Sequence, residues 1–138
     1  MSKASQNRAD VDRALREIMS AGPKPRIRQS DPALRTVDGR TFHSISEAHR
    51  YGQLAMLERA GVIRDLVCQP RFELQPAYVR DGKKEPPIYY YADFGYTLVF
   101  TGGRVIEDVK GHRTEIFKLK RRMLLYQQPD LDFREVPA

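Results

Sequence analysis

Two acidic residues and a lysine lie on strands that the sequence predicts to be neighbours, in a pattern suited to binding a metal ion. Asp93 follows a run of tyrosines, and Asp108 and Lys110 lie in the run IEDVKG. Side chains alternate between the two faces of a strand, so Asp108 and Lys110 share a face while Glu107 lies on the other. Nearby carboxylates repel each other, and a hard cation such as Mg²⁺, which takes oxygen ligands, offsets that repulsion.

A metal ion in such a site polarises a phosphodiester and activates a water molecule for attack. Lys110 would then orient or help to deprotonate the water, or hold the charge that develops on the phosphate. The alternative interpretation is that Asp93, Asp108 and Lys110 are surface charges on a half-exposed sheet. The strand pattern by itself favours this second interpretation.

The distance between the two aspartates depends on the turn that joins their strands. If Gly102 and Gly103 form a two-residue turn, the antiparallel register places Asp108 opposite Thr97. Asp93 shares that face but then lies four residues further along the ladder, roughly 13 Å away at ~3.3 Å per residue. A slipped register or a β-bulge would bring the carboxylates together, and bulges do occur beside active sites.

Two helices are predicted on either side of these strands in the chain. The first, over 45–60, begins after Ser44, which has capping-box spacing to Glu47, and it ends at Gly61. The second helix is predicted over 114–128. Its core-facing residues are expected to be Ile116, Leu119, Met123 and Tyr126.

Strands are predicted from β-branched and aromatic runs. They are a hairpin over 35–42 that turns at Asp38-Gly39, one or two strands over 62–74 broken near Pro70, a long strand over 88–100, a strand over 104–110 and a last strand over 132–136, with a turn over 81–87. The order helix, three strands in antiparallel hairpins, helix, strand predicts a layered α/β domain with a mixed central sheet. The last strand follows a helix, so it is expected to lie parallel to the preceding strand through a right-handed crossover.

Composition narrows the class of protein. The chain has 138 residues, 41% hydrophobic and 30% charged, which is typical of one soluble globular domain. Cys68 is the only cysteine, which excludes an internal disulfide and a cysteine-based zinc site and favours a reducing cytoplasm. No apolar run approaches the ~20 residues of a membrane span. The first residues lack the apolar core of a signal peptide.

The chain is basic, with a net charge of +6 and a pI of about 9.6, which favours a polyanionic partner. We expect residues 1–33 to form an appended segment and residues 34–138 to form the domain. Within that segment an amphipathic helix is predicted over 9–20, and a basic, proline-broken linker over 22–32. The helix either docks on the body or on a second subunit, which we favour, or forms a DNA-contacting arm.

Asp93, followed on the next strand by Asp108-Val109-Lys110, resembles the PD-(D/E)XK motif, the active-site signature of the restriction-endonuclease-like nuclease superfamily. More closely, a set of blocks resembles a phage-associated family of that superfamily over about residues 36–136. The blocks are VDGRTFHSISEAHRY, LVCQPRFELQP, YYYADFGY, IEDVKGHRTEIFKLKRRMLLY and FREV. Members of the family are small proteins usually regarded as endonucleases and often compared with archaeal-type Holliday junction resolvases.

The resemblance implies a restriction-endonuclease-like core with Glu47, Asp93, Asp108 and Lys110 as catalytic residues. Glu47, Asp93 and Asp108 would hold Mg²⁺, with Mn²⁺ as a substitute. Capping of the helix by Ser44 offers a purely structural account of Glu47, worth ~1 kcal/mol. Ala92 stands where the motif has proline.

The function implied is a Mg²⁺-dependent DNA endonuclease that cuts branched DNA such as a Holliday junction. It would act as a homodimer in phage or prophage DNA recombination, in the cytoplasm of a bacterial host. The residues expected to contact DNA phosphates are Arg113, Lys118, Arg121 and Arg122, for which a solvated helix face is the alternative.

Two other functions remain open at this level: a non-catalytic DNA-binding or phage assembly protein that retains a nuclease fold, and metal-dependent cleavage of RNA. His43, His49 and His112 form no metal-ligand pattern, and the sequence assigns no role to Gln69.

Overall fold

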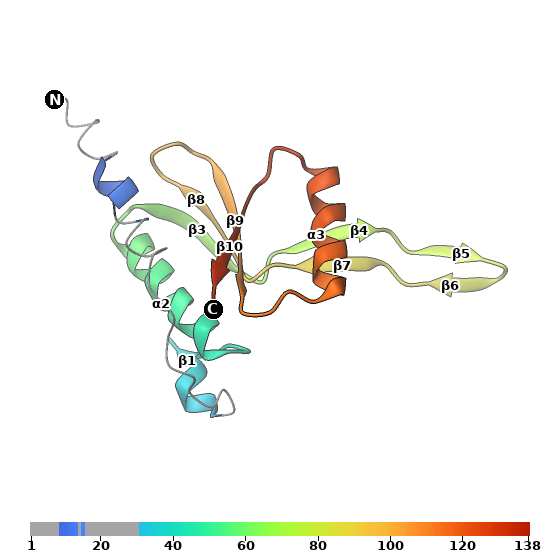
Figure 1. Ribbon diagram of the computed structural model, residues 1–138, viewed down its shortest axis with the longest axis horizontal. Coiled ribbons are helices and arrows are strands. Elements are labelled where there is room, and N and C mark those ends of the chain that lie inside the picture. The colour runs from blue at the N-terminus through green and yellow to red at the C-terminus, as the bar shows by residue number, and fades with distance from the viewer. Residues whose placement is uncertain (1–8, 14, 16–30) are drawn as a thin grey trace.

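The computed structural model describes residues 9–13, 15 and 31–138, and a four-stranded mixed sheet forms its centre (Figure 1). The strands, in their order across the sheet, are β10 (Asp132–Pro137), β9 (Arg104–Lys110), β8 (Phe94–Leu98) and β3 (Ile63–Cys68). β3, β8 and β9 are antiparallel neighbours, and β10 runs parallel to β9. The predicted α/β class, the mixed sheet and the parallel last strand are therefore confirmed.

Both predicted helices form where their capping residues place them. In α2 (Ile45–Arg59), the Ser44 hydroxyl accepts a hydrogen bond from the Glu47 N–H at 3.1 Å. Gly61 follows this helix with a φ of 76°, a conformation that glycine adopts without steric cost. In α3 (Glu115–Gln127), the Thr114 hydroxyl accepts from the Phe117 N–H at 3.1 Å.

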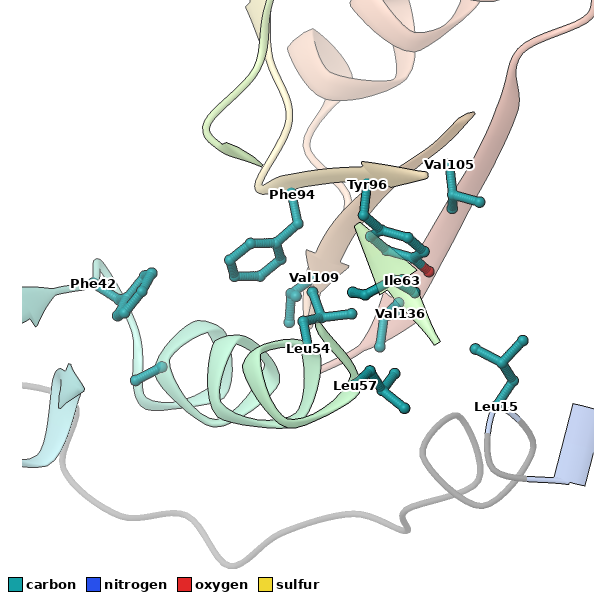
Figure 2. Close-up of a cluster of buried hydrophobic side chains, with 11 residues drawn as sticks. Leu15, Phe42, Leu54, Leu57, Ile63, Phe94, Tyr96, Val105, Val109 and Val136 are labelled. Atoms are coloured by element: carbon teal, nitrogen blue, oxygen red, sulfur yellow. The ribbon is translucent and has the colours of Figure 1, made fainter. Parts of the chain in front are cut away.

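The two helices cover opposite faces of the sheet and bury β9 between two hydrophobic clusters. On the α2 side, Leu54 and Leu57 pack with Phe94, Tyr96 and Val109, as Figure 2 shows. On the α3 side, the buried residues are Leu74, Tyr90, Ala92, Ile106, Phe117 and Leu124. Because both faces are covered, the side chains of β9 are buried from Val105 to Val109 whether they are apolar or charged.

The inward face of α3 differs from the prediction. Phe117 and Leu124 are buried, whereas Ile116, Leu119 and Tyr126 are 69%, 56% and 88% exposed. Both sets have helical spacing, so the pattern alone does not choose between them. Met123 is half-buried and packs against the α3-side cluster, as predicted, but Ile116, Leu119 and Tyr126 were predicted wrongly. The residues of α3 that face the core are Phe117 and Leu124, which pack with Leu74, Tyr90 and, on β9, Ile106. We name its exposed apolar residues the outer stripe: Ile116, Leu119 and Tyr126.

Between β3 and β8 the chain leaves the sheet and forms a long arm (Figure 1). The arm consists of two antiparallel ladders, β4 (Arg71–Gln75) with β7 (Ile88–Tyr91) and β5 (Tyr78–Arg80) with β6 (Lys83–Glu85). The predicted break near Pro70 is confirmed. The predicted strand over 88–100 is instead two strands, and the turn expected over 81–87 is only Asp81 and Gly82. The amino-acid preferences for strand structure are similar before and after these strand ends, so the sequence pattern did not show where the strands stop.

The segment before α2 forms a short 3-10 helix, η1 (Pro32–Arg35), and a small hairpin of β1 (Thr36–Val37) and β2 (Arg40–Thr41). Its turn at Asp38-Gly39, with φ values of 50° and 75°, was predicted correctly. Residues 9–13 and 15 are helical, and Leu15 packs in the α2-side cluster. The other parts of the predicted 9–20 helix, and of the linker up to residue 30, lie outside the described residues. No helix within the described ranges is long and apolar enough to cross a membrane.

Candidate functional site

The two aspartates expected at the site lie across the β8–β9 ladder from each other. The ladder pairs Phe94 with Glu107, and the Asp93 N–H donates to the Glu107 carbonyl at 3.1 Å. Continuing this register by one residue places Asp93 opposite Asp108. Directly opposed side chains in such a ladder have Cβ atoms about 4.5–5.5 Å apart. The sheet therefore brings together the two carboxylates that the motif separates in sequence.

A longer turn than expected produces this register. The Gly102 N–H donates to the Leu98 carbonyl at 2.8 Å and closes a wider loop before β9 begins. The predicted two-residue turn is therefore wrong, and Thr97 pairs with Arg104 rather than with Asp108. Compared with the predicted register, β8 and β9 are shifted so that Asp93 and Asp108, which were expected four residues apart along the ladder, lie opposite each other.

Asp93 is held through its backbone and through one carboxylate oxygen. Its Oδ2 atom accepts a hydrogen bond from the Val109 N–H at 2.6 Å, and its carbonyl accepts one from the Gln69 N–H at 2.8 Å. Burial, then a hydrogen bond and the charge of Asp108, raise the pKa of Asp93 to about 8, with Glu47 adding to the rise and the Val109 N–H opposing it. Asp93 thus holds a proton at neutral pH that a bound cation would displace.

Asp108 is buried, with 1% of its surface exposed. Its Oδ2 atom accepts a hydrogen bond from the Tyr90 hydroxyl. Burial and this hydrogen bond raise the pKa of Tyr90 far above its ordinary value, so the phenol stays protonated and remains a donor. Within the described part of the chain, Oδ1 of Asp108 makes no aligned hydrogen bond, although the Lys110 ammonium lies 2.8 Å from it. Oδ1 is thus paired with the lysine, and a cation that binds there would share or replace that contact.

Lys110 stands at the end of β9, where the strand leaves the core. Its side chain is 28% exposed, and Nζ lies 4.5 Å from the centroid of the Phe117 ring. An ammonium is attracted to the face of an aromatic ring, so α3 helps to hold this charge beside Asp108. The positive charge of Lys110 also lowers the pKa of Glu47. Lys110 therefore offsets the acids and still faces solvent.

Glu47 lies in the first turn of α2 and approaches the aspartates from that helix. Its carboxylate lies 3.9 Å from Nδ1 of His43, and its side chain is 14% exposed. Burial is the largest effect on the pKa of Glu47 and raises it; His43 and Lys110 lower it, while Asp108 adds to the rise. The cap that Ser44 provides involves only the backbone N–H of Glu47, so the carboxylate is available for the site.

A pocket of about 230 Å³ lies beside these acids. Glu47 and Asp93 both line it, so two of the predicted site residues share one opening. The other lining residues are Arg40, Thr41, Phe42, Cys68 and Gln69. Because an arginine and two acids meet here, the pocket suits a small charged group.

Three neighbours of the acids had no role in the sequence interpretation. Tyr90 binds Asp108, and the Gln69 side-chain nitrogen lies 3.3 Å from Nδ1 of His43, which in turn lies near Glu47. The signal for Tyr90 was its place in a run of tyrosines, which does not show which one turns inward. His43 and Gln69 are far apart in sequence, and only the packing of α2 beside β3 brings them together.

The donor chemistry fits a hard divalent cation. Mg²⁺ is commonly bound by one or two carboxylates, with water and substrate phosphates as its other ligands. Asp93 and Asp108 supply two carboxylates, and among the described residues the Lys110 ammonium, at 2.8 Å, is the partner given for Oδ1 of Asp108. Among the residues that the structure describes, no group of three or more His, Cys, Asp or Glu is gathered to hold a metal ion. Glu47 as a third ligand stays a prediction.

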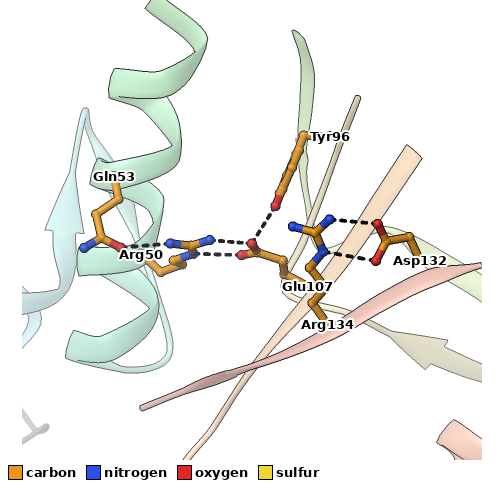
Figure 3. A network of polar contacts seen from close by, with 6 residues as sticks. All are labelled: Arg50, Gln53, Tyr96, Glu107, Asp132 and Arg134. Atoms are coloured by element: carbon orange, nitrogen blue, oxygen red, sulfur yellow. Dashed lines mark hydrogen bonds and ion pairs between the residues drawn. The ribbon is translucent and has the colours of Figure 1, made fainter. Parts of the chain in front are cut away.

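Glu107 faces the opposite side of the sheet, as predicted, and Figure 3 shows its contacts. Its two carboxylate oxygens accept from Nε and a terminal nitrogen of Arg50 at 2.8 and 2.5 Å, and one also accepts from the Tyr96 hydroxyl at 2.7 Å. Asp108 is buried and Asp93 and Lys110 are half-buried, so the alternative of surface charges on a half-exposed sheet is wrong for Asp108.

The basic residues expected to contact DNA are mostly paired with acids. Arg113 and Arg121 lie 2.9 and 3.5 Å from the carboxylate of Glu135, and Lys118 pairs within its own helix at 3.0 Å. Arg122 is exposed. The Lys118–Glu115 pair is exposed, and such pairs are typically worth about 0–1 kcal/mol, so phosphate can replace that acid. Glu135 is half-buried. Contact of these residues with DNA stays a prediction.

Comparison with known families gives one result. The profile of a family described as "Protein of unknown function (DUF1064)" matches residues 33–137. No curated protein and no solved structure matches the chain.

Proposed function

The chain belongs to the DUF1064 family of proteins of unknown function, and we propose that it is a metal-dependent DNA endonuclease. The observation that carries the proposal is the pair of opposed carboxylates, Asp93 and Asp108, with Lys110 at 2.8 Å from the second. A surface or purely structural role does not require two acids to face each other in a buried ladder, because their repulsion is costly.

The residues divide the chemistry between them. Asp93 and Asp108 would hold Mg²⁺, which when bound supplies a Lewis acid for the phosphate and lowers the pKa of a water molecule. Lys110 orients the attacking water or the phosphate and offsets the charge that develops on it. Glu47 provides a further acceptor at the pocket. Tyr90 fixes the carboxylate plane of Asp108 from the α3 side.

The core that we propose is restriction-endonuclease-like. Its support is the order α2, β3, β8, β9, α3, β10, in which a mixed sheet carries the acids on two adjacent strands. The net charge of +6 supports a polyanionic substrate. We assign branched DNA, such as a Holliday junction, as the substrate to test first, because the resemblance of the sequence points to resolvases.

A homodimer is part of the proposal, since two strands of a junction must be cut. The outer stripe is the surface that supports it. Two copies of α3 paired in antiparallel fashion would place Glu115, whose side chain is 90% exposed, near Arg122 of the partner subunit, and the reverse. We expect Leu119→Glu to give a monomer by light scattering. Met56→Glu, at a residue 64% exposed on α2, is the matched control and should leave the mass unchanged.

The test of the activity compares the wild type with Asp108→Asn on branched and linear DNA, with Mg²⁺ or with EDTA. We expect Mg²⁺-dependent cleavage by the wild type and a fall of at least ~100-fold in the variant, the effect typical of removing one preorganised charge contact. Asp65→Asn, at an exposed carboxylate, is the control and should cut normally.

Absence of cleavage of any DNA by the wild type would refute the proposal. Preferred cleavage of RNA in competition with DNA would change the substrate class. If Asp93→Ala and Asp108→Ala both retain every function, the protein is a non-catalytic DNA-binding or assembly protein.

A further inference from the structure

The arm between β3 and β8 begins and ends at the candidate site. It leaves the sheet after Gln69 and returns at Asp93, and the N–H of the first donates to the carbonyl of the second at 2.8 Å. Figure 1 shows the arm extending from the sheet past α3 and into solvent. Both ends of the arm therefore lie at the candidate site, and one of them is Asp93 itself.

The inner half of the arm, β4 with β7, is fixed to α3. Phe72 and Leu74 pack in the α3-side cluster, and the Lys120 ammonium donates to the Tyr89 carbonyl at 2.9 Å. The Gln127 side chain donates to the Leu74 carbonyl at 2.7 Å. Tyr90, on the same ladder, donates to Asp108. The root of the arm is thus rigid and shares a residue with the site.

Within the described part of the chain, the outer half, β5 with β6 and the turn between them, has no such hydrogen bonds to α3 and no residue in the α3-side cluster. We name residues 78–85 the distal ribbon. Seven of these eight residues are exposed, including Tyr78 at 47% and Val79 at 68%, and Glu85 is half-buried. A two-stranded ribbon without a third strand or a helix is marginally stable in water. Its exposed apolar side chains favour a role in which a partner covers them.

The connections to the distal ribbon are stiffened by proline on both strands. Pro76 precedes β5, and Pro86 and Pro87 follow β6. Proline fixes φ near −65° and removes a donor, so both ladders are interrupted here while the chain keeps few conformations. Asp81 and Gly82, with φ values of 51° and 73°, form the tight turn at the tip. The ribbon is therefore presented in a defined shape.

The charges of the distal ribbon identify the class of partner. Arg80 lies directly opposite Lys83 in the ladder, and Lys84 lies opposite Val79. Like charges directly opposite each other are destabilising, and an anion bound between them would relieve the repulsion. The neighbouring acids offset them only weakly, because the Arg80–Asp81 and Lys83–Glu85 pairs, at 3.6 and 4.0 Å, are exposed to solvent.

We propose that the distal ribbon lies in a groove of duplex DNA beside the phosphodiester that is cut. The major groove is about 12 Å wide and admits a two-stranded β-ribbon. Arg80 and Lys83 share one face of the ribbon with Tyr78, and Lys84 shares the other face with Val79. The cations on the two faces contact phosphates on the two walls of the groove, and Tyr78 and Val79 contact the sugars beside them. The choice of DNA as the polyanion rests on the proposed function, whereas the ribbon itself assigns only a grooved, anionic surface.

Binding without cleavage separates this inference from the activity. We would measure the affinity of Asp108→Asn for a labelled duplex in EDTA by fluorescence anisotropy over a range of salt, with and without the triple change R80A/K83A/K84A. We expect the triple variant to bind at least tenfold more weakly. Its slope of log K against log salt should be smaller by about 2–3, since each phosphate contact contributes about 0.9.

The matched control removes three exposed arginines from the other end of the molecule, R13A/R59A/R64A. The net charge changes by the same amount, so an equal loss of affinity in both triple variants would overturn the inference. Unchanged binding by the ribbon variant would overturn it too, even where the wild type cuts DNA. A variant that halves the mass of the protein in light scattering would make the ribbon a subunit contact instead, and would also overturn it.

A photo-crosslink locates the contact directly. Val79→p-benzoylphenylalanine should crosslink to duplex DNA, whereas Met56→p-benzoylphenylalanine, at a similarly exposed residue of α2, should not. Crosslinking of RNA but not DNA, or of neither, would overturn the assignment of duplex DNA. If the Val79→p-benzoylphenylalanine variant crosslinks to duplex DNA while the wild type binds DNA but cuts no substrate, the ribbon is supported and the nuclease is refuted.

Discussion

Glu107 and Asp108 are consecutive residues of β9, they are 0% and 1% exposed, and they face opposite sides of the sheet. Glu107 meets a buried arginine and a tyrosine hydroxyl. Asp108 meets a partly exposed lysine, a tyrosine hydroxyl and the second acid, Asp93. Burial of a carboxylate is thus common to both faces, and the difference lies in whether the surroundings neutralise it.

The comparison teaches how to separate a structural acid from a functional one. On the α2 side one negative charge meets one positive charge in a two-point contact, which leaves Glu107 fully satisfied. On the α3 side two acids share a single lysine, and Asp93 keeps its proton to lower the charge. A buried site that is deficient in positive charge is suited to binding a cation, whereas a neutralised one is suited to holding elements together.

The largest expected effect is on stability, and it concerns the α2 side. Arg50→Ala leaves the buried Glu107 without its cation, which typically lowers the free energy of unfolding by about 3–5 kcal/mol. Urea denaturation followed by circular dichroism measures this. Lys110→Ala removes the corresponding cation of Asp108, and because that lysine is partly exposed we expect a smaller loss. An equal loss in both variants would break the comparison.

Substitutions of Tyr96 and Tyr90 test the same difference between the surroundings of Glu107 and Asp108. Tyr96→Phe removes a hydroxyl that donates to Glu107, and Tyr90→Phe removes one that donates to Asp108. Each hydrogen bond to a charged group is worth about 1.5–3 kcal/mol. We expect Tyr96→Phe to lower stability and leave cleavage unchanged, whereas Tyr90→Phe also lowers kcat. Stability is read from urea melts and kcat from saturation kinetics. A fall in kcat for Tyr96→Phe alone would reverse the assignment.

Asp93→Asn is expected to stabilise the protein without metal at alkaline pH. The ordinary pKa of 3.8 rises to about 8 on folding, so between these values the native state keeps a proton that the unfolded state has lost. Stability from this group is present in acid and is lost as pH rises through about 8. At about 1.4 kcal/mol for each pKa unit, less the screening by solvent, the gain is on the order of 1–2 kcal/mol.

Thermal melts of the wild type and Asp93→Asn between pH 5 and pH 9, in EDTA, measure this gain. The amide oxygen of asparagine still accepts from the Val109 N–H, which makes the variant a close isostere. Asp65→Asn, at an exposed aspartate, is the control and should follow the wild type. If Asp93→Asn is the less stable protein at alkaline pH, the carboxylate is a structural acid like Glu107.

The pH dependence of Mg²⁺ binding tests the same proton on Asp93 in the presence of metal. Because the pKa of Asp93 is about 8, the proton must leave before the carboxylate binds a cation. We expect affinity to rise up to about tenfold for each pH unit below about 8 and to level off above it. Titration calorimetry in buffers of different ionisation enthalpy counts the released protons. Binding that does not change between pH 6 and pH 8 would contradict a role for Asp93 as a ligand.

Much of the fold was predictable because local rules govern it. Ser44 and Gly61 limit the first helix through a hydrogen bond and a backbone conformation that involve only near neighbours. The Asp38-Gly39 hairpin and the break near Pro70 follow from the same kind of rule. The inward face of α3 was not predictable, since two apolar stripes compete and only the position of the arm selects one of them.

The sequence by itself determined which residues have the right chemistry. It placed Asp108 and Lys110 on one face of a strand and Glu107 on the other, because side chains alternate by covalent geometry. It also supplied Asp93 on the preceding strand, and the resemblance to a nuclease motif that joins these residues.

Only the tertiary structure decided whether the acids meet. The wider loop before β9 sets the register that puts Asp93 opposite Asp108, and a loop of other length would have separated them. The two covering helices then bury both acids and raise the pKa of Asp93. Strand register and burial depend on contacts between residues that are distant in the chain. A short stretch of sequence does not contain both partners of these contacts, so it cannot predict them.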